Sequence, residues 1–276
     1  MKNWKTISVI LLAFIVLFAG GFYIAGFRLT GDMKVVRAGS IEVVGLSSGA
    51  EIFIDNAKKK RIAPNEDGAV FLNISPGPHS ILVAMPKFWP WSKEFEISPS
   101  EREVFIPFFA PEEPSGFIIK ENDPEYASLR LALSSLGSPS VFNKRISKSG
   151  RVAVWNEGSV VYAEWLGVLS NAPSPFCPPA SPSGGSVQED LPAGGNCGKI
   201  RPVFESAQTI KNLDFFRDRD DVLVLGTETG IFALELDGAG TRNFQPIYRG
   251  ANLNFLARES DVLYILDGEN LLEIKY

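Results

Sequence analysis

Residues 6–27 form an uncharged and overwhelmingly apolar run near the start of the chain. At about 1.5 Å of rise per residue, a helix of this length crosses the roughly 30 Å hydrocarbon layer of a bilayer. A removable signal peptide has a shorter apolar core and small residues around its cleavage site. The candidate cleavage sites place Ile24 and Phe18 where a small residue is needed. We therefore predict a transmembrane signal anchor over 6–27 that inserts in the lipid bilayer, with a cleaved signal or a buried soluble helix as alternatives.

The charges that flank this run say little about orientation, because two lysines precede it and three basic residues follow it closely. The two cysteines, Cys177 and Cys197, lie far from the run and bracket a stretch rich in proline, glycine and serine. Such a pair is typical of a disulfide in an oxidising compartment, the alternative being two free cytosolic thiols. We predict that residues 1–5 form a short cytoplasmic tail of a single-pass cell-membrane protein whose bulk is extracytoplasmic.

Beyond the run, residues 28–276 are long enough for two domains and carry 25 basic against 32 acidic residues, a net charge of about −7. This negative balance argues against nucleic acid and against an anionic membrane surface as partners of the bulk of the chain. The sequence does not set an oligomeric state. Abundant aromatic residues, glycine and proline favour short strands joined by frequent turns.

After a juxtamembrane linker at 28–38, residues 39–109 alternate between apolar and polar as strands do. Six strands are predicted, at 40–44, 50–54, 69–74, 79–85, 94–97 and 102–106. Asp55 and Asn56 tolerate the left-handed backbone that a tight hairpin needs. This spacing is typical of a small antiparallel β-sandwich.

Three segments of this region are similar to the PEGA domain family: SGAEIFIDN (48–56), SPGPHSILV (75–83) and KFWPWSKEFEI (87–97). The family pattern places glycine at position 56, glycine at 87 and tyrosine at 88, where this chain has Asn56, Lys87 and Phe88. The stretch from Ile24 to Arg28 resembles a motif that follows the membrane helix in anchored relatives. The resemblance implies an extracytoplasmic β module of surface-layer or envelope proteins, without catalytic residues.

Two features of this module are candidates for function. His79, the sole histidine, follows a Pro-Gly turn, where we expect a packing or hydrogen-bonding role rather than catalysis or metal binding. Phe88, Trp89 and Trp91 form a possible aromatic contact surface for sugars or a partner; the alternative is that the two tryptophans cover one end of the sandwich.

The second half of the chain, 110–276, contains a repeat. The segment that begins at Asp221 recurs at Asp261, an offset of 40, and a third copy begins at Gly150 once an insert at about 170–199 is removed. A period near 40 with several short strands is the spacing of β-propeller blades, the alternative being coincident hairpins in an ordinary sandwich. The predicted fold class is therefore all-β with one N-terminal transmembrane helix, a PEGA-like sandwich and propeller-like four-stranded repeats.

The repeats are too few for a usual closed propeller. Either an upstream blade is degenerate, or the sheets form an open arc, or another chain completes the ring. Residues 116–119 are predicted to supply an outer strand to the last copy, which would close the region by its two ends. A short helix is predicted after Glu125, ending at Gly137. A bond between Cys177 and Cys197 would close a loop of about 21 residues in the insert, worth on the order of 3 kcal/mol.

Motifs for chemistry are absent from the sequence: it has no nucleophile elbow, no zincin motif and no phosphate-binding loop. The acidic run of Asp218, Asp220 and Asp221 lacks the glycine and distal glutamate of a calcium loop, so we expect a solvated turn. No metal, cofactor or catalytic residue is predicted. We expect a non-catalytic binding or scaffold protein that contacts envelope polymer or a surface protein; the alternatives are a propeller-borne hydrolase acting on envelope carbohydrate and, less favoured, a sensor with a partner in the same membrane.

Overall fold

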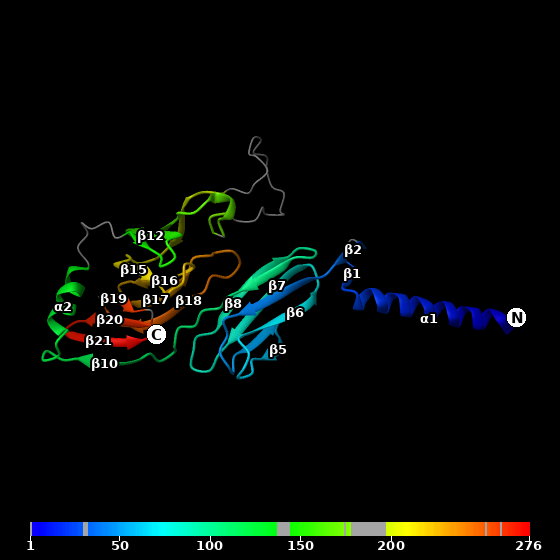
Figure 1. Cartoon of the computed structure of the whole chain (residues 1–276), viewed down its shortest axis with the longest axis horizontal. Coiled ribbons are helices and arrows are strands. Elements are labelled where there is room, and N and C mark those ends of the chain that lie inside the picture. Colours follow the sequence, from blue (N-terminus) through cyan, green and yellow to red (C-terminus); the bar gives the residue numbers. More distant parts are fainter. Residues whose placement is uncertain are drawn as a thin grey trace. The chain divides into compact units, whose positions relative to one another are not determined.

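A computed structural model describes residues 2–29, 33–136, 144–173, 175–177, 197–251, 253–259 and 261–276. The chain is mostly β-structure, with 47% strand against 13% helix, as predicted for the chain beyond its N-terminal helix (Figure 1). It divides into two compact units. The first comprises Met1–Ala84 and Glu94–Pro107, and the second comprises Met85–Lys93 and Phe108–Tyr276.

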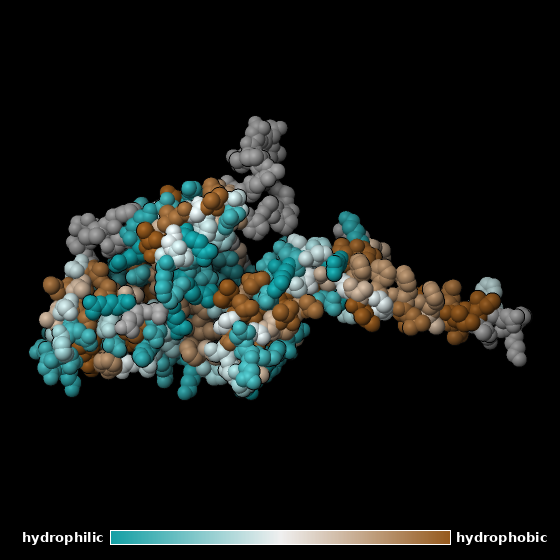
Figure 2. Space-filling view, in the orientation of Figure 1, coloured by the Kyte–Doolittle hydropathy of each residue, from teal (hydrophilic) through white to brown (hydrophobic). Residues whose placement is uncertain are grey.

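The predicted N-terminal helix is present as α1 (Lys2–Ile24), and its part from Ile7 to Ile24 is long and apolar enough to span a membrane. Its apolar side chains are exposed, as the brown surface in Figure 2 shows. The helix begins earlier and ends earlier than the predicted 6–27. It ends before Gly26, whose φ of +85° lies in the left-handed region that commonly ends helices.

The predicted linker at 28–38 contains a hairpin instead of irregular chain. Strand β1 (Phe27–Leu29) pairs antiparallel with β2 (Val35–Arg37) in a sheet of two strands. Sequence periodicity could not reveal such short strands, because three residues are too few for an alternating pattern to stand out.

The rest of the first unit contains strands in two further sheets. One sheet has the order β6-β3-β9 and the other β5-β4-β7-β8. Their bounds are β3 (Gly39–Val44), β4 (Glu51–Ile54), β5 (Ala57–Arg61), β6 (Gly68–Ile74), β7 (Gly77–Ala84), β8 (Trp91–Ile97) and β9 (Arg102–Phe105). All six predicted strands are confirmed. Alternating residues of β3, β4 and β7 are buried, which gives the unit its aliphatic core.

Two details of this unit differ from the prediction. Strand β9 pairs parallel with β3, so the expected all-antiparallel pairing is wrong at this position. Between β6 and β9 the chain passes through β7 and β8 of the other sheet, and it returns to the first sheet running in the direction of β3. Strand β5 was not predicted, because its sequence, AKKKR, is charged and mainly exposed and shows no apolar alternation. The hairpin turn before it is confirmed: Asp55 and Asn56 have φ values of 52° and 60°.

Three four-stranded antiparallel sheets make up most of the second unit, with the orders β11-β12-β13-β14, β15-β16-β17-β18 and β10-β21-β20-β19. The first contains β11 (Arg145–Ile146), β12 (Val152–Glu157), β13 (Val160–Trp165) and β14 (Ile200–Glu205). The second contains β15 (Asn212–Phe215), β16 (Val222–Gly226), β17 (Gly230–Glu235) and β18 (Phe244–Arg249). The third contains β10 (Ser115–Ile119), β19 (Asn254–Glu259), β20 (Val262–Asp267) and β21 (Asn270–Lys275).

The predicted spacing of the repeat is confirmed at the level of strands. Strands β16 and β20 start at Val222 and Val262, and β12 starts at Val152. The first two sheets also share an irregularity of register. The pairing shifts where β13 faces Pro202 of β14 and where β17 faces Pro246 of β18. A proline lacks the N–H that a regular ladder needs, so the same residue type produces the same bulge in both sheets.

The predicted outer strand for the last copy is also confirmed. Strand β10 pairs with β21 over five residues, with Ser115 opposite Lys275 and Ile119 opposite Leu271 (Figure 1). The predicted helix is present as α2 (Tyr126–Ser135). Its buried residues Leu129 and Leu133 pack against Val262 and Tyr264, among other residues, in a core beside the third sheet. A separate core joins the first two sheets through residues such as Val154 and Leu223.

Candidate functional site

A cleft of about 390 Å³ in the second unit is the strongest candidate for a binding site. It is lined by Trp89, Glu112, Glu113, Pro114, Pro246, Ile247, Tyr248 and Arg249. Trp89 and Tyr248 are half-buried, whereas Glu112, Glu113 and Arg249 are exposed. The cleft therefore combines two amphipathic aromatic rings with two carboxylates and a guanidinium, groups that can stack on a sugar ring and hydrogen-bond its hydroxyls.

A buried glutamine fixes the backbone around Trp89. The Oε1 atom of Gln245 accepts a hydrogen bond from the amide of Ala110 at 2.8 Å, and its Nε2 donates to the carbonyls of Pro90 at 3.1 Å and Trp89 at 3.5 Å. The Trp89 amide donates to the Ala110 carbonyl at 3.0 Å. Gln245 is 4% exposed, so these backbone groups have little access to water. Trp89 is thus held on a preorganised backbone.

A second buried polar cluster holds the backbone at Ser92, three residues after Trp89. Asn243 accepts from the Ser92 amide at 2.9 Å and donates to the Ser92 carbonyl and to Glu235, at 2.8 and 2.9 Å. The Lys93 ammonium lies 3.3 Å from carboxylate oxygens of both Glu235 and Asp237. Burial raises the pKa of Glu235, although Lys93 and Asn243 partly oppose this effect. Buried ions need such partners, because an unpaired charge would be strongly destabilising.

Tyr248, which also lines the cleft, is oriented by Asp267. Its hydroxyl donates to Oδ2 of Asp267 at 3.0 Å. Burial, followed by this hydrogen bond, raises the pKa of Tyr248, so the phenol stays neutral and donates at physiological pH. Its oxygen keeps lone pairs that can accept from a ligand hydroxyl.

The three aromatic residues predicted as a contact surface have different positions. Trp89 lines the cleft. Phe88 is half-buried, pairs with Pro111 through an isolated β-bridge and lies edge-on to Phe109 with ring centroids 6.4 Å apart. Trp91 is 2% exposed, so it is part of the core instead of a contact surface.

Sequence reasoning missed Gln245, Asn243 and Tyr248. They lie on or next to β18, a segment for which the sequence predicted neither a strand nor a function. The one available signal is that polar Gln245 is flanked by Phe244 and Pro246, in a segment that the repeat places in a sheet. A polar side chain at an inward position must find hydrogen-bond partners. The partners of Gln245 lie 135 or more residues away in sequence, so the residues around it do not reveal them.

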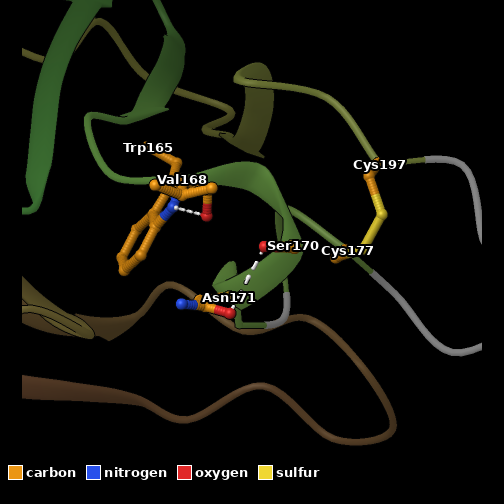
Figure 3. Close-up of a disulfide and its surroundings, with 6 residues drawn as sticks. All are labelled: Trp165, Val168, Ser170, Asn171, Cys177 and Cys197. Carbon is orange, nitrogen blue, oxygen red and sulfur yellow. Dashed lines mark hydrogen bonds between the residues drawn. A yellow bond between two sulfur atoms is a disulfide. The ribbon is translucent and has the colours of Figure 1, made fainter.

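The predicted disulfide between Cys177 and Cys197 is present (Figure 3). The described ends of the insert are tied to the adjacent core. Phe176 is buried with its ring 5.8 Å from that of Trp165, and the indole N–H of Trp165 donates to the Val168 carbonyl at 3.0 Å. Most of the predicted insert, 178–196, lies outside the described residues.

The acidic run at 218–221 forms ion pairs. Asp218 lies 2.7 Å from Lys148, Asp220 lies 3.1 Å from Arg151, and Asp221 pairs with Arg219. These contacts connect the turn before β16 with the turn before β12. Within the parts of the chain that the structure describes, no group of three or more potential ligands could hold a metal ion.

His79 lies beside a shallow hollow of about 360 Å³ in the first unit. Its Nδ1 is 2.8 Å from Asp55, and its Nε2 is 2.6 Å from the carbonyl of Ser75. Burial opposes ionisation of Asp55, but hydrogen bonds from His79 and Ser80 prevail, so the pKa of Asp55 is lowered. Both ring nitrogens are thus engaged within the fold, which confirms the predicted hydrogen-bonding role.

Comparison of the chain with protein-family models finds no match, and comparison with curated proteins finds no significant relative.

Proposed function

We propose that the chain is a membrane-anchored binding protein of the cell envelope, and that the cleft beside Trp89 holds a carbohydrate segment of an envelope polymer. The observation that carries this proposal is a preformed cleft with an aromatic ring on a backbone fixed by Gln245. Stacking on Trp89 would supply apolar contact with a sugar face, while Glu112, Glu113 and Arg249 would hydrogen-bond its hydroxyls.

The proposed location rests on α1 and on the disulfide. A helix able to span a bilayer supports single-pass anchoring, and a disulfide in a chain with only two cysteines supports an oxidising, extracytoplasmic compartment for the bulk of the protein. In this proposal the first unit is a PEGA-like sandwich. The three sheets of the second unit are propeller-like blades, since each has four antiparallel strands and two share a bulge at a proline.

The test uses the full-length protein in nanodiscs, titrated with defined oligosaccharides from envelope polymers by calorimetry and tryptophan fluorescence. Trp89→Ala is expected to weaken binding at least tenfold, in line with the loss of an aromatic anchor. Phe117→Ala is the matched control, because Phe117 is exposed in the same unit but does not line the cleft. Equal affinities for Trp89→Ala and the wild type, or no binding of any oligosaccharide, would overturn the proposal.

The same samples examine the catalytic alternative. Glu112 and Glu113 both line the cleft, so hydrolysis would need one of them as acid or base. We expect bound oligosaccharide to be recovered intact. Release of new reducing ends that Glu112→Gln or Glu113→Gln abolishes would instead assign a hydrolase.

A further inference from the structure

The hairpin β1–β2 directly follows the membrane-spanning helix and forms a sheet of its own. Phe27 pairs with Arg37, and Leu29 pairs with Val35. Because side chains alternate along a strand, Phe27, Val35 and Arg37 share one face of the hairpin. Two-stranded hairpins are at best marginally stable in water, so a partner for this face would stabilise it.

Two apolar residues of the shared face, and Met33 two residues before β2, are exposed. Met33 is 81% exposed, Val35 57% and Phe27 37%. The ring of Phe27 lies 5.1 Å from that of Phe22 on α1, so this apolar surface continues from the surface of the helix. Contiguous exposed apolar surface of this kind is typical of an interaction site.

Arg28 ties the hairpin to the end of the helix. Its Nη1 donates to the carbonyls of Tyr23 and Phe27, both at 2.9 Å, and its Nη2 donates to the Asn73 carbonyl at 3.2 Å. The guanidinium also lies 3.8 Å from the centre of the Tyr23 ring. Tyrosine is enriched where a membrane helix leaves the hydrocarbon layer. With α1 inserted in a bilayer, these contacts would hold the hairpin beside the lipid headgroups.

The hairpin carries positive charge, which suits a position beside lipid headgroups. Arg28, Lys34 and Arg37 lie within ten residues of one another, and the side chains of Lys34 and Arg37 are exposed. Asp32 is the one acidic residue between Phe27 and Arg37, so the three basic residues leave this segment with a net charge of about +2. A basic, apolar segment beside a membrane span attracts anionic lipid. The net negative charge of the rest of the chain has little effect on this local attraction, because salt screens charges that lie more than about a Debye length away.

We propose that the β1–β2 hairpin is a lipid-binding element that inserts Met33 and Val35 into the interface of the bilayer and binds anionic phospholipid headgroups through Lys34 and Arg37. This inference rests on the proposed membrane anchoring by α1. The hairpin would bind the leaflet on the side of the first unit, because it is held against the end of the helix within that unit.

The test is hydrogen exchange of the full-length protein in nanodiscs, measured by mass spectrometry on peptides that cover β1 and β2. Nanodiscs contain phosphatidylcholine alone or a three-to-one mixture with phosphatidylglycerol. We expect exchange at least tenfold slower in the anionic nanodiscs, and we expect Lys34→Gln with Arg37→Gln to remove the difference. Met33→Ser should speed exchange in both lipids.

The matched control is Lys59→Gln with Arg61→Gln, which removes two exposed charges from β5 in the same unit. The control should keep the full lipid effect. Equal exchange in both lipids for the wild type, or loss of the effect in the control, would overturn the inference. Failure of the anchoring itself gives a different result, since the protein would then not incorporate into nanodiscs of either composition.

Discussion

The amide of Ala110 donates a 2.8 Å hydrogen bond to the side-chain oxygen of Gln245, and both residues are buried. The two lie 135 residues apart in sequence. Through this contact and the bonds from Nε2 to Trp89 and Pro90, one side chain on β18 determines the backbone on which the candidate cleft is built. Preorganisation of this kind reduces the entropic cost of binding.

Replacement of Gln245 by leucine should therefore affect stability and binding together. The change leaves the buried Ala110 amide without its acceptor, and we expect the free energy of unfolding of the second unit to fall by about 2–3 kcal/mol. Urea denaturation followed by circular dichroism measures the loss. Gln208→Ala is the control, because the Gln208 side chain accepts an exposed hydrogen bond from Thr229. A Gln245→Leu protein as stable as the control would contradict the role assigned to this residue.

Gly116→Val should break the closure of the third sheet. A Cβ at position 116 would lie 2.1 Å from the carbonyl oxygen of Glu273 on the partner strand, a distance that requires the backbone to move. We expect a loss of more than about 2 kcal/mol in stability and faster amide exchange in β10 and β21. Ser115→Ala, one residue earlier on an exposed position, should change neither quantity. Unchanged protection of β21 would show that the two strands do not depend on each other.

Tyr276 makes stability sensitive to alkaline pH. Burial raises the pKa of Tyr276 to about 12 from an ordinary value of 10.0. The contribution of the neutral phenol to stability is thus complete below pH 10 and is lost as pH rises towards 12, an effect of about 2–3 kcal/mol. Tyr276→Phe should flatten the fall in the free energy of unfolding over this interval, measured by urea titration at pH 8 and at steps from 9.5 to 12. Identical slopes for the two proteins would refute the assignment.

Asp55→Asn isolates the contribution of the Asp55 charge, beside His79 in the first unit. The lowered pKa of Asp55 means that its carboxylate stabilises the fold above its ordinary pKa of 3.8 and loses this effect as pH falls through the lower folded value. Asparagine keeps the tolerance for the positive φ of the turn. Because half of the Asp55 side chain is exposed, we expect a loss below about 1 kcal/mol at pH 6 and none near pH 2. A loss that is the same at both values would point to the turn geometry and away from the charge.

Removal of the disulfide should destabilise the second unit. With Cys177→Ser and Cys197→Ser, the unfolded chain regains the freedom of a closed loop of about 21 residues, which corresponds to about 3 kcal/mol in the loop-entropy model. Urea denaturation of the double variant beside the oxidised wild type gives the difference. Mass spectrometry of protein from its native membrane should show the bond intact, and two free thiols there would contradict both the bond and the proposed compartment.

The strands were predictable wherever apolar and polar residues alternate, as in β3, and wherever a repeat places similar segments at equal offsets, as in β16 and β20. The outer strand β10 was predictable because the last repeat lacked its fourth strand. Strand β5 and the β1–β2 hairpin could not be predicted from periodicity, since one is charged throughout and the other has strands of three residues. The parallel pairing of β9 depends on the route of the chain through space, which local patterns do not encode.

Of the candidate site, only Trp89 was anticipated. Trp91, two residues away, is equally aromatic but buried, and nothing in the tripeptide Trp-Pro-Trp distinguishes which ring faces outward. The polar residues that hold this segment, Gln245 and Asn243, act through contacts that exist only after distant segments meet. Their function in the site is a property of tertiary structure.

The pairing of β10 with β21 also affects how the protein is made. Ser115 bonds to a strand that ends at Lys275, so the first strand of the second unit stays without its neighbour until the ribosome has added about 150 more residues. Pairings so distant along the chain are slow to form and leave a strand edge open to aggregation in the meantime. A chaperone that shields β10 during synthesis would therefore raise the yield of this protein more than that of one built from local hairpins alone.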